Sequence, residues 1–460
     1  MSLLRQEHVH AAAEKYAQHI NPAFVRLLGT FGYGRVFVRA EGMTLWDAEG
    51  REYLDFLGAF GAANLGHNPP RLLAAIREHL TTEAPSLVHV GPQVHAAELG
   101  AALAARVPEL PMVMLSLSGG EAVESALKLA RAATGRPGLL SCEGGFHGTG
   151  FGNLSVMGHG RMRAPFGPLL PGCRRIPYGD LDALDRALGD RAQAAFLVEP
   201  IAAEAGIIVP PDGYLRDSLE LCRRHGTLLV LDEVQTGLGR TGRLFAHQWE
   251  QDAVPDVLVL GKSLGGSVVP VSAALTTAEL HRRAFGTAAT FDLHGSTFSG
   301  YSLGCAAALA TLAILDEEGL AERAERAGRR MLDALRARLG GHPLVRDIRG
   351  RGLLLGLELG PTRSGLLNRL APGLVSAVSE KVFGQWLALR LLEEGILCQP
   401  ASQQWNVLRL EPPLIVTDPE IDRVVDTIAR VLGEYRELAP LLADVGRRLG
   451  RQLGDGWRFG

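Results

Sequence analysis

The amino-acid sequence predicts an α/β protein, with a mostly parallel central sheet flanked by helices in a large domain and a small α+β domain at the C-terminal end. Between about residues 70 and 340, short apolar runs alternate with longer helical patterns, as in chains that build parallel sheets. The clearest runs are almost continuously apolar and are bounded by Gly or Pro, which is typical of strands buried on both faces. These runs are AAFLVEPI (194–201), GTLLVLDEV (226–234), DVLVLGK (256–262) and PVSAALTT (270–277).

The same patterns predict three parts along the chain. Residues 1–60 have a polar helical start and a hairpin-like GMTLWDAEGREYLDF, and we expect this segment to pack with the small domain. Residues 61–335 are expected to form the large domain. A helical stretch rich in Ala, Leu, Glu and Arg (302–340) leads away from this domain. Residues 336–460 are expected to form the small domain.

Within the small domain, RGRGLLLGLEL and NVLRLEPPLIV are expected to be strands. DPEIDRVVDTIARVLGEYREL is expected to be an amphipathic helix capped by Thr417 or Asp418. Between the strands lies an apolar segment with helical spacing, LLNRLAPGLVSAVSEKVFGQWLALRLL, whose simplest interpretation is a packed helical insertion.

The composition excludes several classes of protein. Apolar residues make up 47% and charged residues 21%, which matches a folded globular chain, and a net charge of −3 argues against a nucleic-acid partner. Five Cys without a CxxC pair predict reduced thiols, no metal site and a cytoplasmic setting. We expect no membrane partner, because the start has no signal-peptide core and no 18-residue stretch is apolar enough to span a bilayer.

Basic residues are divided unevenly, since only four of the 47 are Lys: Lys15, Lys128, Lys262 and Lys381. The excess of Arg is best explained by compositional bias. It nevertheless leaves few candidates for chemistry that needs a primary amine.

The first candidate ligand site is Ser118-Gly119-Gly120-Glu121, at the start of the helical run AVESALKLARAA. Ser and Glu three residues apart form a capping box. Two glycines allow close approach to the backbone, and a helix N-terminus attracts an anion. Taken alone, the pattern is more often a helix cap than a phosphate site.

Two further candidates follow buried strands. Asp232 ends the most apolar strand, at the sheet edge where ligands bind in open α/β folds, although such a carboxylate can also cap a turn. Lys262 follows the next strand and precedes a Gly-rich turn. Partial burial lowers the pKa of an amine, as a Schiff-base lysine requires, and the alternative is an amine that extends to solvent from the strand end.

An anion cradle, a carboxylate and an amine together suit pyridoxal 5'-phosphate. That cofactor has a phosphate, a pyridine nitrogen and an aldehyde, and a carboxylate beside the nitrogen keeps the ring protonated as an electron sink.

On these residues the chain resembles the class III aminotransferases (ornithine, putrescine and GABA type) of the fold-type-I pyridoxal-phosphate superfamily. The resemblance runs from about residue 35 to 435. The motifs that carry it are SGGEAVESALKLAR, FHG (146–148), VEPIAAEAG, LDEVQTGLGRTG, GKSLGG, HGSTFSG and LRLEPPL.

The resemblance implies a role for each matching residue. Lys262 would be the Schiff-base lysine and the acid and base of the proton shift, and Asp232 the partner of the pyridine nitrogen. The other cofactor-binding positions it implies are Ser118 and the amides of Gly119 and Gly120 at the phosphate, Phe146 and Val234 on the two ring faces, Glu199, Gln235 at the ring hydroxyl, and Ser296 with Thr297 at the phosphate of a neighbouring subunit. The last position implies a homodimer with shared active sites. Without the resemblance, Phe146 could be core, Gln235 a turn residue, and Thr297 part of a helix cap.

On the substrate side, the resemblance makes Arg409 the residue that receives a substrate carboxylate, for which its planar fork is suited. Glu204 matches an acid that pairs with this arginine in some members. We hypothesise that Glu204 neutralises Arg409 while an amine or aldehyde is bound, and swings aside for an α-keto acid such as 2-oxoglutarate or pyruvate. The alternative is a surface ion pair of little consequence.

Three departures from the family pattern leave the substrate open. Thr149 stands where the family usually has Arg, Ser299-Gly-Tyr301-Ser-Leu replaces GGNPL, and the segment 361–392 is longer than in putrescine-type relatives. The leading interpretation is a transaminase acting on a primary amine or diamine, putrescine-like or another ω-amine. Alternatives are a biosynthetic enzyme acting on a bulkier aldehyde, an aminomutase or racemase using the same cofactor site, and a silent scaffold, against which the intact Lys262 and Asp232 argue.

Overall fold

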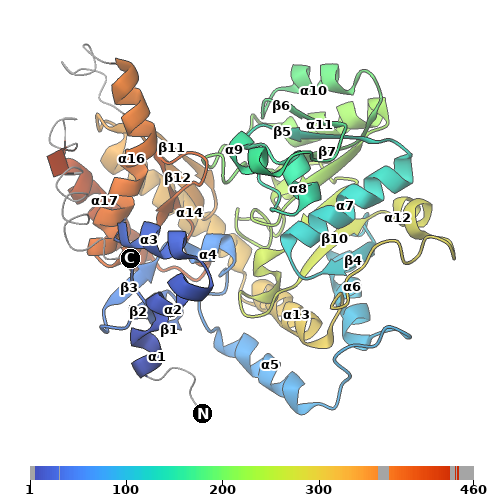
Figure 1. Cartoon of the computed structure of the whole chain (residues 1–460), viewed down its shortest axis with the longest axis horizontal. Helices are drawn as coiled ribbons and strands as arrows, with labels where there is room; N and C mark the ends of the chain where they lie inside the picture. The colour runs from blue at the N-terminus through green and yellow to red at the C-terminus, as the bar shows by residue number, and fades with distance from the viewer. Residues whose placement is uncertain (1–5, 31, 361–371, 436–440, 442, 445–460) are drawn as a thin grey trace.

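The computed structural model describes residues 6–30, 32–360, 372–435, 441, 443 and 444 (Figure 1). A seven-stranded sheet lies at the centre of its larger half, in the order β4-β10-β9-β8-β7-β5-β6. The strands are β4 (Met112–Ser116), β5 (Gly138–Cys142), β6 (Cys173–Ile176), β7 (Gln193–Val198), β8 (Leu228–Asp232), β9 (Val257–Leu260) and β10 (Ser272–Thr276). Neighbours from β6 to β9 pair in parallel, and β10 runs antiparallel to both of its neighbours. The predicted mostly parallel sheet is confirmed.

The central strands are apolar throughout because alternate residues pack into different cores. In β7, Phe196 and Val198 belong to the main core cluster, with Tyr214 of α11 (Tyr214–His225). Ala195 and Leu197 belong to a second cluster, with Ala126 of α7 (Gly119–Thr134). Both faces of the sheet are therefore covered, which explains the continuous apolar runs in the sequence.

Helices surround this sheet (Figure 1). In chain order they are α5 (Pro70–Thr81), α6 (Val94–Arg106), α7 (Gly119–Thr134), α8 (Phe151–Val156), α9 (Gly160–Arg163), α10 (Leu181–Leu188), α11 (Tyr214–His225), α12 (Ala278–Phe285) and α13 (Ser302–Glu317). Short 3-10 turns cover Ala164–Phe166, Ala246–Trp249 and Lys262–Gly265.

The smaller half contains two four-stranded sheets, in the orders β1-β2-β3-β13 and β11-β12-β15-β14. Their strands are β1 (Phe37–Glu41), β2 (Thr44–Asp47), β3 (Glu52–Asp55), β11 (Val345–Arg351), β12 (Leu354–Leu359), β13 (Ile396–Leu397), β14 (Gln399–Pro400) and β15 (Val407–Leu410). The predicted hairpin is β2 and β3. Because β13 pairs in parallel with β3, the N-terminal segment joins the C-terminal part of the chain.

The helices described in the smaller half are α1 (Gln6–His10), α2 (Ala12–His19), α3 (Pro22–Thr30), α14 (Leu320–Leu339), α16 (Pro372–Glu393) and α17 (Asp418–Gly433). A short turn, α4 (Gly58–Gly61), leads from β3 towards the large sheet. α17 begins after a capping box between Thr417 and Glu420, which settles Thr417 as its cap. Of the predicted insertion at 361–392, residues 361–371 lie outside the described part of the chain.

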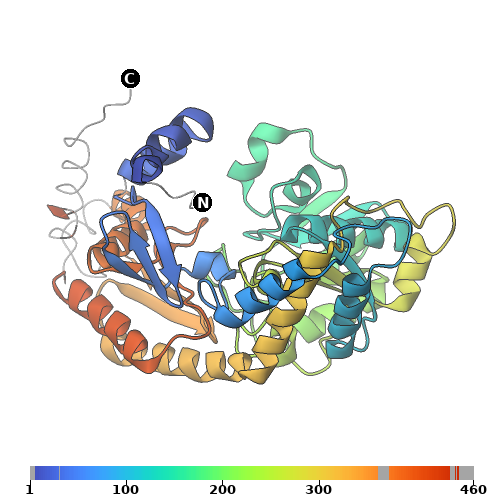
Figure 2. The same ribbon diagram turned by 90° about the horizontal axis from the view of Figure 1, so that it is seen from below.

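The helical stretch predicted over 302–340 is two helices rather than one. Gly319, with a left-handed φ of 57°, separates α13 from α14. α13 packs beside the large sheet and α14 continues along the small ones, so the pair links the two halves (Figure 2). The domain boundaries at 60 and 335 remain a prediction. In the described ranges, no helix combines the length and apolarity needed to cross a membrane. The same residues include no group of three or more His, Cys, Asp or Glu placed to hold a metal ion.

Candidate active site

A cavity of about 200 Å³ opens at the carboxyl edge of the large sheet. Parallel strands end at this edge, so loops that are far apart in the sequence converge there. The lining residues are Gly119, Gly120, Phe146, His147, Gly148, Glu199, Asp232, Val234, Gln235 and Lys262. Eight of these were predicted at the cofactor site, and the structure brings them together around one cavity.

Glycines form one wall of the cavity, at the start of α7. A Cβ on Gly119 would lie 2.7 Å from Val234 Cγ1, and one on Gly120 would lie 3.0 Å from Asn153 Nδ2. A side chain at either position would crowd these neighbours, so glycine keeps the backbone close to them. The first amides of a helix have no partner within it, so this wall suits an anion.

Ser118 does not line the cavity but caps α7. Its Oγ accepts a hydrogen bond of 3.3 Å from the Glu121 amide. The predicted capping box is only half formed, because the Glu121 carboxylate accepts from the amide of Leu117, one residue earlier, at 2.8 Å. The cap fixes the direction in which the glycine amides point.

Asp232 is held by a buried histidine that the sequence reasoning missed. His147 Nδ1 donates to Asp232 Oδ2 at 2.8 Å, and the Val234 amide donates to Asp232 Oδ1 at 3.0 Å. Burial lowers the pKa of His147, but its hydrogen bond to Asp232 and the charge of that carboxylate outweigh this, so the pKa lies above its ordinary value. The Asp232 carboxylate is thus held in a fixed orientation at the cavity wall. The available signal was the place of His147 in the FHG motif.

Glu199 anchors the loop that carries Phe146. Its carboxylate accepts hydrogen bonds from the Phe146 amide at 3.0 Å and the Ala203 amide at 3.3 Å. Burial, with a smaller contribution from the charge of Asp232, raises the pKa of Glu199 to about 7 against the opposing charge of His147. Glu199 therefore titrates near neutral pH behind the ring position of Phe146.

Lys262 enters the cavity from a strained turn after β9. Its φ of 44° is left-handed, a conformation that costs a residue with a side chain about 1–2 kcal/mol. The amine donates a hydrogen bond to Gln235 Oε1. Removal from water lowers the pKa of Lys262 below its ordinary value, and this effect outweighs the opposing charges of Glu204 and Glu411. The lower pKa increases the fraction of neutral, nucleophilic amine.

A second cavity of about 400 Å³ adjoins the first and shares Phe146 and Lys262 with it. Its other lining residues are Phe60, His159, Arg161, Met162, Glu204, Ser402 and Gln403. Phe60 follows Ala59 in a left-handed turn, with φ values of 59° and 50°. Two consecutive strained residues persist only where the surroundings enforce them, and such strain concentrates at functional sites.

Glu204 and Arg409 form an ion pair at this second cavity. Arg409, on β15, is 1% exposed, and the Phe60 ring lies 4.9 Å from its guanidinium carbon. Burial raises the pKa of Glu204, but the charges of Arg409 and Lys262 outweigh this and hold the pKa below its usual range. The interpretation as a surface ion pair is therefore wrong, because both partners are buried.

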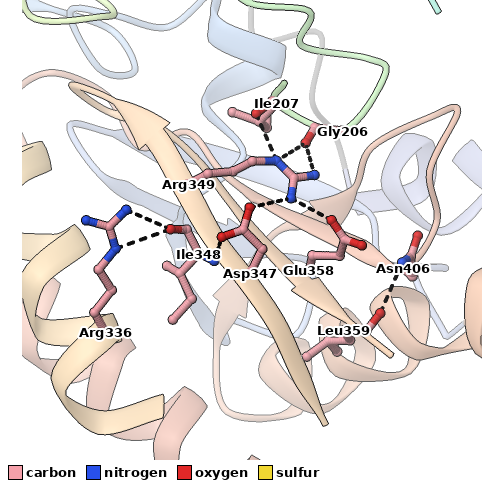
Figure 3. Close-up of polar contacts among 9 residues, drawn as sticks. All are labelled: Gly206, Ile207, Arg336, Asp347, Ile348, Arg349, Glu358, Leu359 and Asn406. Carbon is pink, nitrogen blue, oxygen red and sulfur yellow. Dashed lines mark hydrogen bonds and ion pairs between the residues drawn. The ribbon is translucent and has the colours of Figure 1, made fainter. Parts of the chain in front are cut away.

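The loop that carries Glu204 is tied to the small sheet by Arg349 of β11 (Figure 3). Its guanidinium donates to the carbonyl of Gly206, at 2.6 and 3.0 Å, and to that of Ile207 at 3.1 Å. The same guanidinium pairs with Glu358 on β12. The backbone beside Glu204 is thus fixed. Its carboxylate, among the residues that the structure describes, accepts hydrogen bonds from Arg409 and from the Ser402 amide, the latter at 3.1 Å.

Two predicted positions lie away from the cavities of this single chain. Thr297 is exposed, and the Ser296 amide donates a local hydrogen bond to Ser299 Oγ at 3.1 Å. Neither lines a described cavity. Their predicted contact with a neighbouring subunit stays a prediction.

Taken together, the fold and the first cavity define a class of enzyme. A mostly parallel sheet whose carboxyl edge joins a glycine cradle, a pinned carboxylate and a low-pKa amine fits a pyridoxal-phosphate enzyme. The model of the class-III aminotransferase family matches residues 32–432. The chain belongs to this family, and it is a pyridoxal-phosphate-dependent transaminase.

Individual relatives agree with this assignment. The chain is 37% identical over 408 residues to an ornithine aminotransferase of an Exiguobacterium species, covering 86% of this chain and 92% of that one. It is 36% identical over 453 residues to the aminotransferase PigE of a Serratia species, covering 92% of this chain but only 53% of PigE. The chain thus spans about half the length of that relative.

Solved structures show the same fold. The ornithine aminotransferase of Toxoplasma gondii ME49 is 33% identical with a TM-score of 0.81, over 94% of this chain and 96% of that one. A pyridoxal-phosphate-bound amine transaminase from an uncultivated Pseudomonas species is 29% identical with a TM-score of 0.77, over 87% and 95% of the two chains.

Proposed function

We propose that this transaminase takes an amino group from a primary amine or diamine and delivers it to an α-keto acid. The observation that carries the proposal is the buried ion pair between Glu204 and Arg409 at the cavity that also contains Lys262. An amine donor has no carboxylate beside the reacting carbon, so without Glu204 the buried Arg409 would lose the one carboxylate that accepts a hydrogen bond from it among the described residues. Glu204 supplies the missing partner while such a donor is bound.

The keto acid brings its own carboxylate, which can replace Glu204 on Arg409. The replacement conserves the charge around the guanidinium, whose planar fork can donate two hydrogen bonds to a carboxylate. Because the backbone near Glu204 is tied down by Arg349, we expect only the side chain to move. One site can then accept two substrates of different charge in turn.

The roles proposed for the cofactor half follow from its geometry. Bound pyridoxal phosphate supplies an electron sink for the carbon that loses its proton. Asp232, pinned by His147, would keep the pyridine nitrogen protonated, and the amides of Gly119 and Gly120 would hold the phosphate. Lys262 would hold the aldehyde and then move the proton between substrate and cofactor carbons, for which its lowered pKa is suited.

A dicarboxylate such as 2-oxoglutarate is the acceptor that the second cavity favours over pyruvate. Besides Arg409, which pairs with Glu204 at the wall, Arg161 and His159 line the same cavity. Within the described ranges, Arg161 forms no hydrogen bond or ion pair. The second carboxylate of 2-oxoglutarate could therefore pair with Arg161. Arg161 would take this role although Thr149 stands where relatives usually have Arg.

A bulkier aldehyde is a second candidate for the amino-group partner. The cavity of about 400 Å³ has apolar walls from Phe60, Phe146 and Met162. These walls suit an apolar chain next to the reacting carbon.

We also propose that the working enzyme is a homodimer in a reducing compartment such as the cytoplasm. Around Thr297, the apolar side chains of Phe291, Leu293 and Phe298 are 50% or more exposed, which marks a surface that a partner can cover. All five cysteines are free thiols, as that compartment would maintain them. Sedimentation at working concentration should give twice the 49.2 kDa of one chain.

The proposal is tested with ¹⁵N-labelled putrescine, other ω-amines and apolar amines as donors, each with 2-oxoglutarate or pyruvate. We expect label in the amino acid made from the keto acid and release of an aldehyde. Label that remains in the donor's own carbon skeleton would support an aminomutase and overturn the proposal. Lys262→Ala is the matched control, and it should lose both the transfer and the visible absorption band of the bound cofactor.

A further inference from the structure

One buried carboxylate beside the active site has no part in the transfer described so far. Glu411 lies two residues after Arg409, in LRLEPPL, and is 0% exposed. Its Oε1 accepts a hydrogen bond of 2.6 Å from Gln235 Nε2, the amide that also reaches Lys262 through its oxygen. Its Oε2 lies 3.9 Å from Arg409 Nη1 and has no hydrogen-bond partner among the described residues. A buried acid with an unsatisfied oxygen is costly, which calls for a functional explanation.

Glu411 is fixed in place, in contrast to Glu204. Its amide donates to the carbonyl of Phe56 at 2.9 Å, and two prolines follow it. A Cβ on Gly58 would lie 2.3 Å from the Glu411 carbonyl oxygen, so the two backbones are already in contact. A carboxylate on this backbone, held by Gln235, keeps its place whichever substrate is bound.

Two of the carboxylates near the reacting amine act on both Lys262 and Arg409. Glu204 forms an ion pair with Arg409, Glu411 lies 3.9 Å from it, and the charges of both carboxylates act on Lys262. If Glu204 swings aside, Glu411 remains as the counter-charge of Arg409. In a poorly solvated interior a charge at this distance acts strongly on any ion that enters.

We propose that Glu411 determines specificity as a positioning residue, by making the site prefer the cationic amine donor and by weakening the hold of Arg409 on the anionic keto acid. The inference rests on the proposed function, because it concerns the two substrates of that reaction. A fixed negative charge attracts an ammonium ion and repels a carboxylate whatever the position of Glu204. Glu411 thus keeps the keto acid from occupying Arg409 so tightly that the donor is excluded.

The test is Glu411→Gln in the holoenzyme, which keeps the shape and the acceptor for Gln235 but removes the charge. The two half-reactions are followed separately, by the change in cofactor absorbance with putrescine alone and with 2-oxoglutarate added to the aminated enzyme. We expect the apparent Kd of the keto acid to fall about ten-fold and that of the amine to rise about ten-fold, the size of one close charge interaction. The maximal rate of each half-reaction should change by less than about three-fold.

Glu325→Gln is the matched control, since Glu325 pairs with Arg243 and Arg329 and lines neither of these cavities. It should leave both constants unchanged. Glu411→Asp keeps the charge but moves it by one methylene, and it should shift the constants in the same directions by a smaller factor. This second variant serves if Glu411→Gln does not fold.

Constants that move together, or that do not move in a folded variant, would overturn the inference and indicate a structural role. Failure of the proposed function is distinguishable, because the wild-type enzyme would then show no absorbance change with any amine.

Discussion

The two cavities that meet at Lys262 are built in different ways. The cofactor cavity lies at the carboxyl edge of one sheet, and each residue that lines it follows closely on a strand or opens a helix. The substrate cavity takes Phe60 from a turn after β3, Glu204 from a loop after β7, and Ser402 from the small half of the molecule. The first depends on one rigid element, whereas the second depends on how three parts of the chain are held together.

The difference also appears in the electrostatics. In the cofactor cavity, Asp232 is fixed by two hydrogen bonds from neighbouring segments. In the substrate cavity, Arg409 has one fixed carboxylate and one whose side chain can leave. We infer that substitutions in the cofactor cavity reduce the rates with all substrates together. Substitutions in the substrate cavity should instead change the rate with one substrate more than with another.

The largest effect is expected for Asp232→Asn in the cofactor half. An amide cannot keep the pyridine nitrogen protonated, so kcat/KM should fall about 100-fold for the donor and the acceptor alike, as for loss of a hydrogen bond to a charged group. Steady-state rates with both substrates measure this. Asp256→Asn is the control, since Asp256 is a partly buried acid that precedes β9 at the opposite edge of the sheet. Activity of Asp232→Asn within about three-fold of wild type would contradict the assignment.

A smaller and selective effect is expected for Arg161→Ala in the substrate half. The KM for 2-oxoglutarate should rise about ten-fold, as expected for loss of one charged contact, while the KM for pyruvate stays unchanged. Parallel titrations of the two acceptors measure this. Arg174→Ala removes an exposed arginine paired with Asp190 and is the control. Equal changes for both acceptors would show that Arg161 does not bind the distal carboxylate.

The smallest effect is expected in the pH dependence of stability at Glu199. The pKa of this acid is about 7 in the folded protein and near its ordinary value of 4.5 in the unfolded chain. Between these values the folded state holds a proton that the unfolded state lacks, so the Glu199 contribution makes stability fall as the pH rises. The slope is at most about 1.4 kcal/mol per pH unit.

Denaturant unfolding of the wild type and Glu199→Gln at pH 5 to 7 measures this difference. The wild type should lose more stability than the variant as the pH rises. Parallel curves for the two proteins would show that Glu199 does not titrate in this range.

The sequence was most informative where the backbone is regular. The apolar runs predicted β7 to β10, and because parallel strands share one edge, Asp232 and Lys262 could be expected near each other. The hydrogen bonds that Asp232 and Lys262 form could not be predicted from the sequence. His147 stands beside Phe146 in the FHG motif, yet only the fold shows its hydrogen bond to Asp232.

The substrate half was harder to predict because it depends on distant segments. No periodicity in the sequence predicts that the Phe60 ring stacks on Arg409, because a left-handed turn sets the direction of the Phe60 side chain. Glu411 lay in the motif LRLEPPL, but its partner Gln235 is 176 residues away in sequence. Likewise, the helical stretch over 302–340 carried a glycine whose left-handed conformation breaks it, and composition alone did not distinguish one helix from two.

The most direct test of the account is the effect of Glu204→Gln on the two half-reactions of the holoenzyme. A neutral Gln cannot offset Arg409 while the amine is bound, whereas the keto acid supplies its own carboxylate. The kcat/KM of the amine half-reaction should fall about ten-fold and that of the keto-acid half-reaction by less than about three-fold, with the cofactor absorption band unchanged. Equal losses in both half-reactions would contradict the exchange of partners on Arg409.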